Sequence, residues 1–355
     1  MKFINLVTFF VIVSFWSCQT PDSEYKTKNV SLQIVDSFHV AINKVSFHLQ
    51  DYNEKTQTYL AYDAVLKTLY ELNDSFELKK KIDLEHKDKN GYGPQNFGSC
   101  YLNDSTVAVL GFDSFYFYNT DWELIRNIPL PDNRTALQQP NWAIYSLNDG
   151  NSILFSSKIR GEENSKPPLT LLNLEESATS PITTFGEYTK ESLYLKEANS
   201  QLTNTVLFSA SDDKIFSINE HEPVFAEYDL DGSILNQNTL FIDGFFKNFN
   251  PLDFNLTGRE RLQDEAKNDV IKSLHTHENT HALNLFKGKD DPDDDLQRYL
   301  VLLKGNNISQ PIEFKPPFLG LGAFLPNGDL LMHASPKDQE KSSGFWYYKV
   351  KIEGL

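Results

Sequence analysis

The chain has 355 residues, of which 40% are hydrophobic and 13% aromatic, and this is enough to bury a large core. Its 33 basic and 49 acidic residues give a formal net charge of -16, which argues against a nucleic-acid partner and against electrostatic docking on anionic lipid. The 26 Phe and 16 Tyr residues stand beside two Met residues, a balance that favours sheet packing over helical bundles. We therefore expect an all-β globular protein.

The first residues, 1–17, predict a signal peptide. Lys2 supplies a positive charge, and Phe3 to Phe15 is a largely apolar run that is too short for a membrane span, which needs about 20 residues. The pattern ends at Cys18 and resembles a bacterial lipoprotein signal, in which lipid is attached to the cysteine thiol. The alternative is an ordinary secretory signal with an incidental cysteine. Residues 18–29 are polar and are expected to form a tether.

The resemblance to a lipoprotein signal implies a location as well. The mature chain is expected to be an outer-membrane lipoprotein that faces the periplasm or the cell surface, with the lipid bilayer as its partner through Cys18. Cys100 is then the only other thiol, so no intramolecular disulfide is expected. Because Cys100 lies in an apolar stretch, we interpret it as a small buried hydrophobic residue.

The residues from Gly91 to Leu130 have the pattern of one complete four-stranded module. Turn-forming residues separate four short apolar stretches, which is typical of an antiparallel meander. The stretches are Phe97–Leu102, Thr106–Leu110, Phe115–Tyr118 and Glu123–Ile128. Similar modules recur along the chain, and this repetition predicts a β-propeller.

The composition of single strands supports the same architecture. Several strands, such as FYFY and YLVLL, lack the alternation of an open sheet with one wet face. A blade packed between two neighbours is buried on both faces, so its strands are apolar throughout. The alternative, an array of two-sheet sandwiches, would alternate more cleanly.

Five full modules precede a final one that begins near Leu319 and offers three strands. The unassigned strand Val30–Ile42 can supply the fourth, which would leave no open sheet edge. We therefore predict one domain over residues 30–355, a six-bladed β-propeller with four-stranded antiparallel blades, closed by an N-terminal strand. Seven blades would require the long fifth module to be split.

The fifth module carries an insertion, at about residues 241–275, which is expected to be helical. A capping-box pattern at Thr257–Glu260 starts a helix whose apolar residues share one face. These apolar residues are Leu262, Ala266, Val270 and Leu274. Phe245 and Phe246 lie in the aromatic loop before the helix and are candidates to bind a sugar ring. The alternative is a hydrophobic plug under the helix.

The segment from His277 to His281 matches the H-E-x-x-H pattern of zinc peptidases, in which two helical histidines bind zinc and the glutamate (here Glu278) activates water. Its two central residues are poor helix formers, and Ala282–Phe286 reads as a strand. We therefore interpret the match as fortuitous and expect neither a metal nor a cofactor. Elsewhere the chain has no nucleophile elbow, no Walker loop and no dinucleotide fingerprint, so no catalytic residue is assigned.

The G-x-G-P-x-x-F corner at Gly91–Phe97, together with the lipoprotein signal, the hairpins and the length, resembles the six-bladed, TolB-like propeller lipoproteins of the Bacteroidota. These include a family known only as a domain of unknown function. The resemblance covers most of the mature chain and implies a fold without an activity. Tyr92, Gln95 and Asn96 are candidates to line a binding mouth, and the alternative is a purely structural corner.

We thus predict an envelope lipoprotein whose propeller face binds a glycan, a peptide or a partner protein, without demonstrable catalysis. The alternative is a propeller enzyme, a lyase or hydrolase, whose site lies in the axial channel and is built from several blades. A scaffold subunit of an envelope complex is a third candidate.

Overall fold

The computed structural model describes residues 25–40, 47–83, 91–93, 95–137, 143–159, 168–174, 182–190, 206–251, 253, 255–289, 294–334 and 345–355. The predicted signal peptide, Cys18 and the start of the tether lie outside these residues. Within them, no helix is both long enough and apolar enough to cross a membrane.

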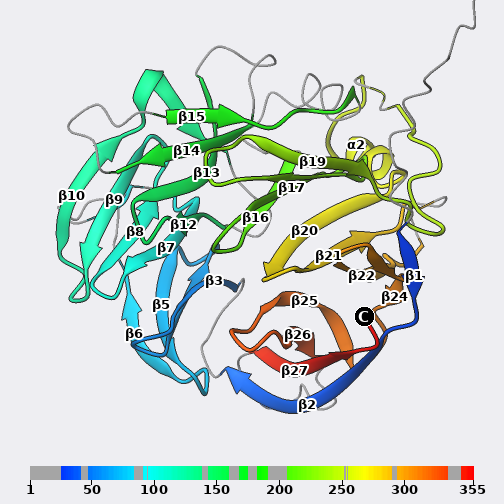
Figure 1. The fold of residues 1–355 in the computed structure, drawn as a ribbon, viewed down its shortest axis with the longest axis horizontal. Coiled ribbons are helices and arrows are strands. Elements are labelled where there is room, and N and C mark those ends of the chain that lie inside the picture. Colours follow the sequence, from blue (N-terminus) through cyan, green and yellow to red (C-terminus); the bar gives the residue numbers. More distant parts are fainter. Residues whose placement is uncertain are drawn as a thin grey trace, which may run out of the picture.

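The strands form six sheets arranged around a common axis (Figure 1). Blade one contains β3 (His48–Asn53), β4 (Thr58–Asp63), β5 (Thr68–Asn73) and β6 (Leu78–Ile82). Blade two contains β7 (Gly98–Asn103), β8 (Thr106–Leu110), β9 (Ser114–Asn119) and β10 (Leu124–Pro129). Blade three contains β12 (Tyr145–Leu147), β13 (Ser152–Ile159), β14 (Leu169–Asn173) and β15 (Ile182–Phe185). A short 3-10 helix, η1 (Pro131–Asn133), leads into the additional strand β11 (Arg134–Ala136), which also pairs with β13.

The other three blades complete the ring. Blade four contains β16 (Val206–Ala210), β17 (Ile215–Asn219), β18 (Val224–Tyr228) and β19 (Ile234–Thr239). Blade five contains β20 (Val270–His277), β21 (Thr280–Phe286), β22 (Arg298–Lys304) and β23 (Asn307–Ser309), with β24 (Ile312–Glu313) also on β22. Blade six contains β25 (Phe318–Phe324), β26 (Leu330–Ala334), β27 (Phe345–Glu353) and β2 (Ser31–Val40). The prediction of an all-β, six-bladed propeller with four-stranded antiparallel blades is confirmed.

The N-terminal segment runs along the outside of two blades. The short strand β1 (Lys26–Lys28) pairs in parallel with β23 of blade five. After it, β2 pairs antiparallel with β27, from Ser31 opposite Glu353 to Val40 opposite Phe345. The first and last long strands of the chain therefore share one sheet, and the backbone groups at the outer edge of β27 are hydrogen-bonded.

The strand sequence FYFY of β9 shows why these strands do not alternate between apolar and polar residues. Phe115 and Phe117 pack against Phe155 and the rest of the core between blades two and three. Tyr116 and Tyr118 point the other way and belong to the core between blades one and two. Because both faces of the blade meet a neighbouring blade, both sets of side chains are apolar or aromatic.

The outermost strands differ from the inner ones because one of their edges and most of their side chains meet solvent. Five of the six residues of β19 are exposed, whereas all five residues of β17, an inner strand of the same sheet, are buried. The buried inner strands are thus fixed by packing on both sides, and a pocket built on them is held rigidly.

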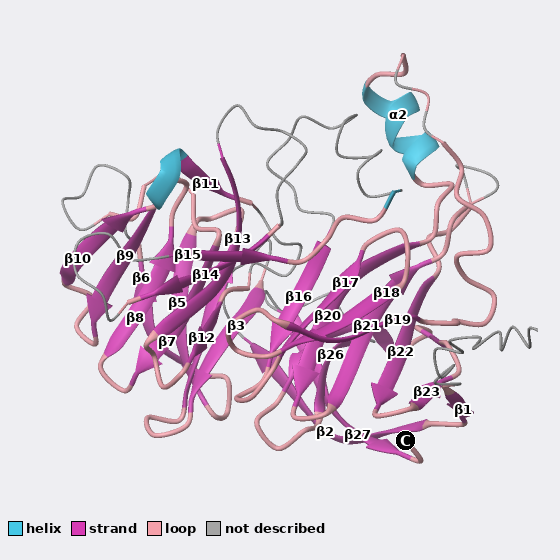
Figure 2. Ribbon diagram, turned by 45° about the horizontal axis from the view of Figure 1, so that its top comes forward, coloured by secondary structure: helices cyan, strands magenta, loops and turns pink. Residues whose placement is uncertain are grey.

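The predicted helix is much shorter than expected. The α-helix α2 spans Gly258–Glu265 and stands outside the ring of strands (Figure 2). Val270 and Leu274, which were expected on its apolar face, lie in β20 and are buried in the core. That part of the prediction is wrong. A β-bulge between Ile271 and Ser273 puts Val270 and Leu274 on opposite faces of β20, and both are apolar because the blade is buried on both faces.

Candidate functional site

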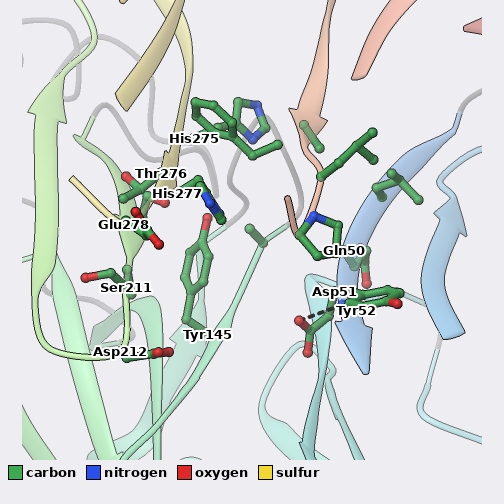
Figure 3. A pocket seen from close by; sticks show the side chains of 18 of the residues that line it. Gln50, Asp51, Tyr52, Tyr145, Ser211, Asp212, His275, Thr276, His277 and Glu278 are labelled. Carbon is green, nitrogen blue, oxygen red and sulfur yellow. Dashed lines mark hydrogen bonds between the residues drawn. The ribbon is translucent and has the colours of Figure 1, made fainter. Parts of the chain in front are cut away.

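A pocket with a volume of about 740 Å³ lies on the axis of the propeller (Figure 3). Its walls come from five blades, mainly from their innermost strands and the turns that follow these strands. The lining residues are Leu49–Tyr52, Glu54 and Tyr59 of blade one, Ala143 and Tyr145 of blade three, Ser209–Asp213 of blade four, His275–Asn279 of blade five, and Ala323–Pro326 of blade six. The volume lies within the range of about 300–1,000 Å³ that is typical of small-molecule sites.

The pocket exists because the inner strands end together. Strands β3, β16, β20 and β25 each run toward the pocket and then turn into the second strand of the same blade. Such tight turns favour Asp, Asn and Gly, because these residues tolerate unusual backbone angles and bond to the local backbone. In blade five, for example, Glu278 adopts a positive φ of 51° at the turn. The turns therefore bring polar and acidic side chains to the rim.

Asp51 is the least exposed of the carboxylates that line the pocket. It lies on β3, and its two oxygens accept hydrogen bonds from the backbone N–H groups of Tyr52, at 2.8 Å, and Tyr101, at 2.7 Å. Burial raises the pKa of Asp51 to about 6, although the two N–H donors act in the opposite direction. Asp51 is thus a carboxyl group that titrates close to neutral pH and faces the pocket.

His275 lies on β20 of blade five. Burial, together with the nearby imidazole of His48 on β3, lowers the pKa of His275 to about 4. The pKa of His48 is also lowered to about 4, chiefly by burial. Both imidazoles are therefore neutral at neutral pH, and His275 contributes no positive charge to the pocket.

The lining contains five carboxylates and no lysine or arginine. The carboxylates are Asp51, Glu54, Asp212, Asp213 and Glu278. In the part of the chain that the structure describes, none of them forms an ion pair. The hydroxyl of Ser211 donates a hydrogen bond to Asp213 at 2.9 Å. The lining is thus strongly acidic and, among the described residues, carries no lysine or arginine as a counter-charge.

Aromatic rings form the remaining walls. Tyr145 stands between Asp51 and Asp212 in the view of Figure 3, and its ring packs edge-on against Phe208 of blade four. Tyr52 lies on the opposite side, where its hydroxyl donates a hydrogen bond to Asp74 at 2.9 Å. Phe324 adds an apolar surface from blade six. These rings can contact the apolar part of a ligand while the carboxylates contact its polar groups.

The H-E-x-x-H segment forms a β-hairpin at the rim of this pocket. His277 is opposite Thr280, and Thr276 is opposite His281, so the two histidines point to opposite faces of blade five. The ring of His281 packs on Phe216 of blade four at 4.4 Å, whereas that of His277 packs toward Phe324 of blade six. A helical zinc site needs both imidazoles on one side. Among the described residues, no group of three or more metal-ligating side chains gathers around one point.

The Gly91–Phe97 corner lies at the start of inner strand β7, whereas the pocket is built mainly on the far ends of such strands. Tyr92 is only 1% exposed, and its hydroxyl donates a hydrogen bond to the carbonyl of Lys67 in blade one at 2.8 Å. The side-chain oxygen of Asn96, which is buried, accepts a hydrogen bond from the backbone N–H of Gly98 at 2.7 Å. Gln95 is exposed. None of these three side chains lines the axial pocket, and Tyr92 joins blades one and two.

The aromatic loop is packed against blade five. Phe245 is buried in the core that joins blades four and five, and its ring meets Tyr299 edge-on at 5.0 Å. The ammonium group of Lys287 lies over the same ring at 4.7 Å. Phe246 is partly buried, and its backbone N–H donates a hydrogen bond to Asp269 at 2.7 Å. These contacts are those of a hydrophobic plug, and they are separate from the axial pocket.

Of the residues that line the pocket, only His277 and Glu278 stand out in the sequence, and there as part of a zinc-peptidase pattern that was interpreted as fortuitous. Asp51, Asp212 and Glu278 each lie in or beside a hairpin turn, where acidic residues are common for structural reasons. The sequence does contain a signal for the pocket, namely acidic residues in the first turns of the blades. The first turn of every blade must lie on the same face of a propeller, so these residues come close together. Aligning these turns by blade would have shown that acidic residues recur there.

Solved structures with the same fold match over nearly the whole chain. A member of the DUF4221 family from Bacteroides vulgatus has a TM-score of 0.67 at 13% identity, and the match covers 93% of this chain and 100% of that one. A protein described as exported, from Bacteroides fragilis, has a TM-score of 0.61 at 13% identity, with 91% and 95% of the two chains covered.

A third similar structure is a gluconolactonase from Xanthomonas campestris, with a TM-score of 0.52 at 8% identity and 92% and 95% of the chains covered. At these identities the likeness shows the fold alone. No family model matches the chain, and no curated protein matches it in sequence. The protein is thus a six-bladed β-propeller that is similar in structure to Bacteroides proteins.

Proposed function

We propose that the protein is an exported, lipid-anchored propeller of the TolB-like type that binds a ligand in its axial pocket. The observation that carries this proposal is the pocket of about 740 Å³, to which five of the six blades contribute side chains. A cavity of this size, with aromatic walls and several unpaired polar groups, is the usual form of a binding site. The predicted ligand classes are a small glycan, a peptide or an extended loop of a partner protein.

A binding screen tests the pocket as the ligand site. The thermal midpoint of the purified protein is measured with panels of glycans, peptides and small metabolites, and we expect at least one panel to raise it. The matched variant is Ala323→Phe, which fills the pocket from β25 and is expected to abolish the shift. The control is Ala266→Phe, which adds the same ring beside α2. A ligand that shifts wild type and Ala323→Phe equally would place binding outside the pocket.

The anchor and the location rest on the signal that ends at Cys18, and the exported Bacteroides fragilis protein supports export. We expect radiolabelled palmitate to be incorporated into the wild-type chain in its bacterial host but not into Cys18→Ser. The labelled chain should fractionate with outer membranes, and protease treatment of intact cells distinguishes a surface-facing from a periplasmic domain. Release of the wild-type chain as a soluble periplasmic protein would contradict the anchor.

A second candidate function, an enzyme with its site in the axial channel, is favoured by one observation. Asp51, whose pKa is raised to about 6, and neutral His275 face the same pocket and could act as proton donor and acceptor. A gluconolactone is a reasonable first substrate because one structurally similar propeller is a gluconolactonase. Turnover that disappears in Asp51→Asn would support the enzyme, and equal turnover in wild type and variant would exclude Asp51 from it.

A further inference from the structure

Every first turn on the face where the pocket opens carries at least one carboxylate. In each blade the first turn joins two antiparallel strands at the same end, so all six first turns lie on one face. Together these turns contain seven carboxylates and two lysines. The carboxylates are Glu54, Asp104, Asp149, Asp212, Asp213, Glu278 and Asp329, and the lysines are Lys55 and Lys214.

Both lysines are engaged by carboxylates outside the pocket lining. Lys55 forms an ion pair with Asp104 of the neighbouring blade. Lys214 forms one with Glu227, at 3.3 Å. The carboxylates that line the pocket therefore keep their charge uncompensated. Such a rim produces a negative potential that attracts cations and repels anions, and the net charge of the chain adds to it.

The interior of the pocket also favours a cationic ligand. Tyr52, Tyr145 and Phe324 present aromatic surface between the acidic groups. The face of an aromatic ring attracts an organic cation, and the ring also packs against its carbon chain. His275 adds no competing positive charge, because its imidazole is neutral. An anionic ligand would meet repulsion and no cationic partner among the lining residues.

The size of the pocket favours an organic cation over a metal ion as the ligand. Calcium or magnesium needs several oxygen ligands within about 2.6 Å of one point. No group of three or more such side chains gathers around one point in the described residues. The carboxylates instead come from blades one, four and five and surround a space of about 740 Å³. This arrangement fits a ligand with a carbon skeleton and cationic groups at more than one end.

We propose that the axial pocket binds an organic cation with primary ammonium groups, which are held by the rim carboxylates Asp212, Asp213 and Glu278 and by Asp51 on the opposite wall. The carbon chain between the ammonium groups packs on Tyr145. This inference rests on the proposed function, because it names the ligand class of the same pocket. Two sources share this chemistry, a free polyamine and the lysine side chains of a peptide.

Isothermal titration of the purified protein tests the proposal with two probes, the triamine spermidine and a trilysine peptide. Each is paired with its fully N-acetylated form, which keeps the carbon chain and removes the charges. We expect at least one charged probe to bind with one-to-one stoichiometry and its acetylated form to bind at least about tenfold more weakly, because the carboxylates lose their counter-charge. Which charged probe binds more tightly distinguishes the polyamine from the peptide.

The double variant Asp212→Asn/Asp213→Asn is expected to weaken binding of the charged probe about fivefold or more, and raising the salt from 50 to 500 mM should weaken it similarly. The control Asp121→Asn removes one negative charge from an exposed outer turn of blade two and should leave the affinity unchanged. Equal binding of charged and acetylated probes, binding of calcium alone, or no binding of either charged probe would overturn the proposal.

The experiments distinguish two failures: that the ligand of the pocket is not a cation, and that the pocket binds no ligand. A neutral or anionic compound whose thermal shift is lost in Ala323→Phe would keep the pocket as a binding site and refute the cationic ligand class. If no compound of any charge gives a shift that depends on the pocket, both are refuted. A folding defect in Ala323→Phe is detected by its own thermal midpoint, and Ala210→Phe then replaces it on the wall of blade four.

Discussion

The axial pocket and the aromatic loop at Phe245 both combine aromatic rings with carboxylates, but they differ in how the carboxylates are used. In the loop, Asp269 accepts hydrogen bonds from the backbone N–H groups of Phe246 and Gly288 and forms an ion pair with Lys287 at 3.0 Å. In the pocket, no lining carboxylate has a cationic partner among the described residues. The carboxylate of the loop is thus neutralised by a lysine, whereas those of the pocket keep a negative charge that a ligand can meet.

The largest expected effect comes from removing the carboxylate of the loop. Asp269→Ala leaves two backbone N–H groups without their acceptor and Lys287 without its carboxylate partner, and we expect a loss of about 3 kcal/mol in the free energy of unfolding. Urea unfolding followed by circular dichroism measures it. The control Asp243→Ala removes an exposed carboxylate from the same loop and should change little. A loss below about 1 kcal/mol in Asp269→Ala would remove the contrast between the two regions.

The two histidines of the H-E-x-x-H hairpin show the same contrast between a residue that supports the fold and one that lines the pocket. His281 is buried between blades, and His277 faces the rim. His281→Ala removes a ring packed on Phe216 and Phe225, and we expect it to cost about 2 kcal/mol of stability. His277→Ala should cost less, because its side chain is only partly buried. A chelator such as EDTA should leave the thermal midpoint of the wild type unchanged. A chelator-dependent fall that both substitutions abolish would show that the two histidines hold a metal.

The pH dependence of stability tests the buried carboxyl at the bottom of the pocket. Because the pKa of Asp51 is about 6 in the folded protein against 3.8 ordinarily, the folded state binds the extra proton between these values. The contribution of Asp51 to stability therefore falls as the pH rises from about 4 to about 7.

Asp51→Asn should consequently gain stability relative to the wild type over this pH range. We expect a gain of about 1–2 kcal/mol, which is less than the full pKa shift implies because solvent screens the charge of the carboxylate. The neutral histidines act in the opposite direction, since a lowered histidine pKa destabilises the fold as the pH falls below about 6.5. The comparison is therefore made between variant and wild type at each pH by urea unfolding. A constant difference across the range would show that Asp51 has an ordinary pKa.

The smallest expected effect on stability belongs to the rim. Asp212→Asn/Asp213→Asn changes two exposed side chains without ion-pair partners in the described part of the chain, so its free energy of unfolding should stay within about 0.5 kcal/mol of the wild type. The same double variant should lose affinity for a charged probe. A clear loss of stability would show that these carboxylates support the fold.

The fold was accessible from the sequence because its signals are local. Turn residues and doubly apolar strands such as FYFY define the blades one at a time, and they predict both the strand order and the number of blades. The helix was over-extended through Val270 and Leu274, since a strand buried on both faces carries apolar residues at any spacing and only the pairing with β21 decides between strand and helix.

The pocket could not be predicted from local sequence patterns as the fold could. Asp51, Asp212 and His275 are far apart in the sequence and come together only when the ring closes around the axis. The residues that the sequence singled out, Tyr92 and Phe245 among them, stand out because they are aromatic and lie near glycine. In the structure these features serve packing between blades. Residue type alone does not show whether a polar group already has a partner inside the protein.

Hydrogen exchange of the wild-type chain, measured by mass spectrometry with and without the tighter of the two charged probes, tests the central claim most directly. We predict that the ligand slows exchange in residues 209–213 and 275–279, whose backbone surrounds the pocket, and leaves residues 241–249 of the aromatic loop unchanged. Slowed exchange in residues 241–249 or 91–97, with none at the rim of the pocket, would contradict the assignment of the axial pocket as the binding site.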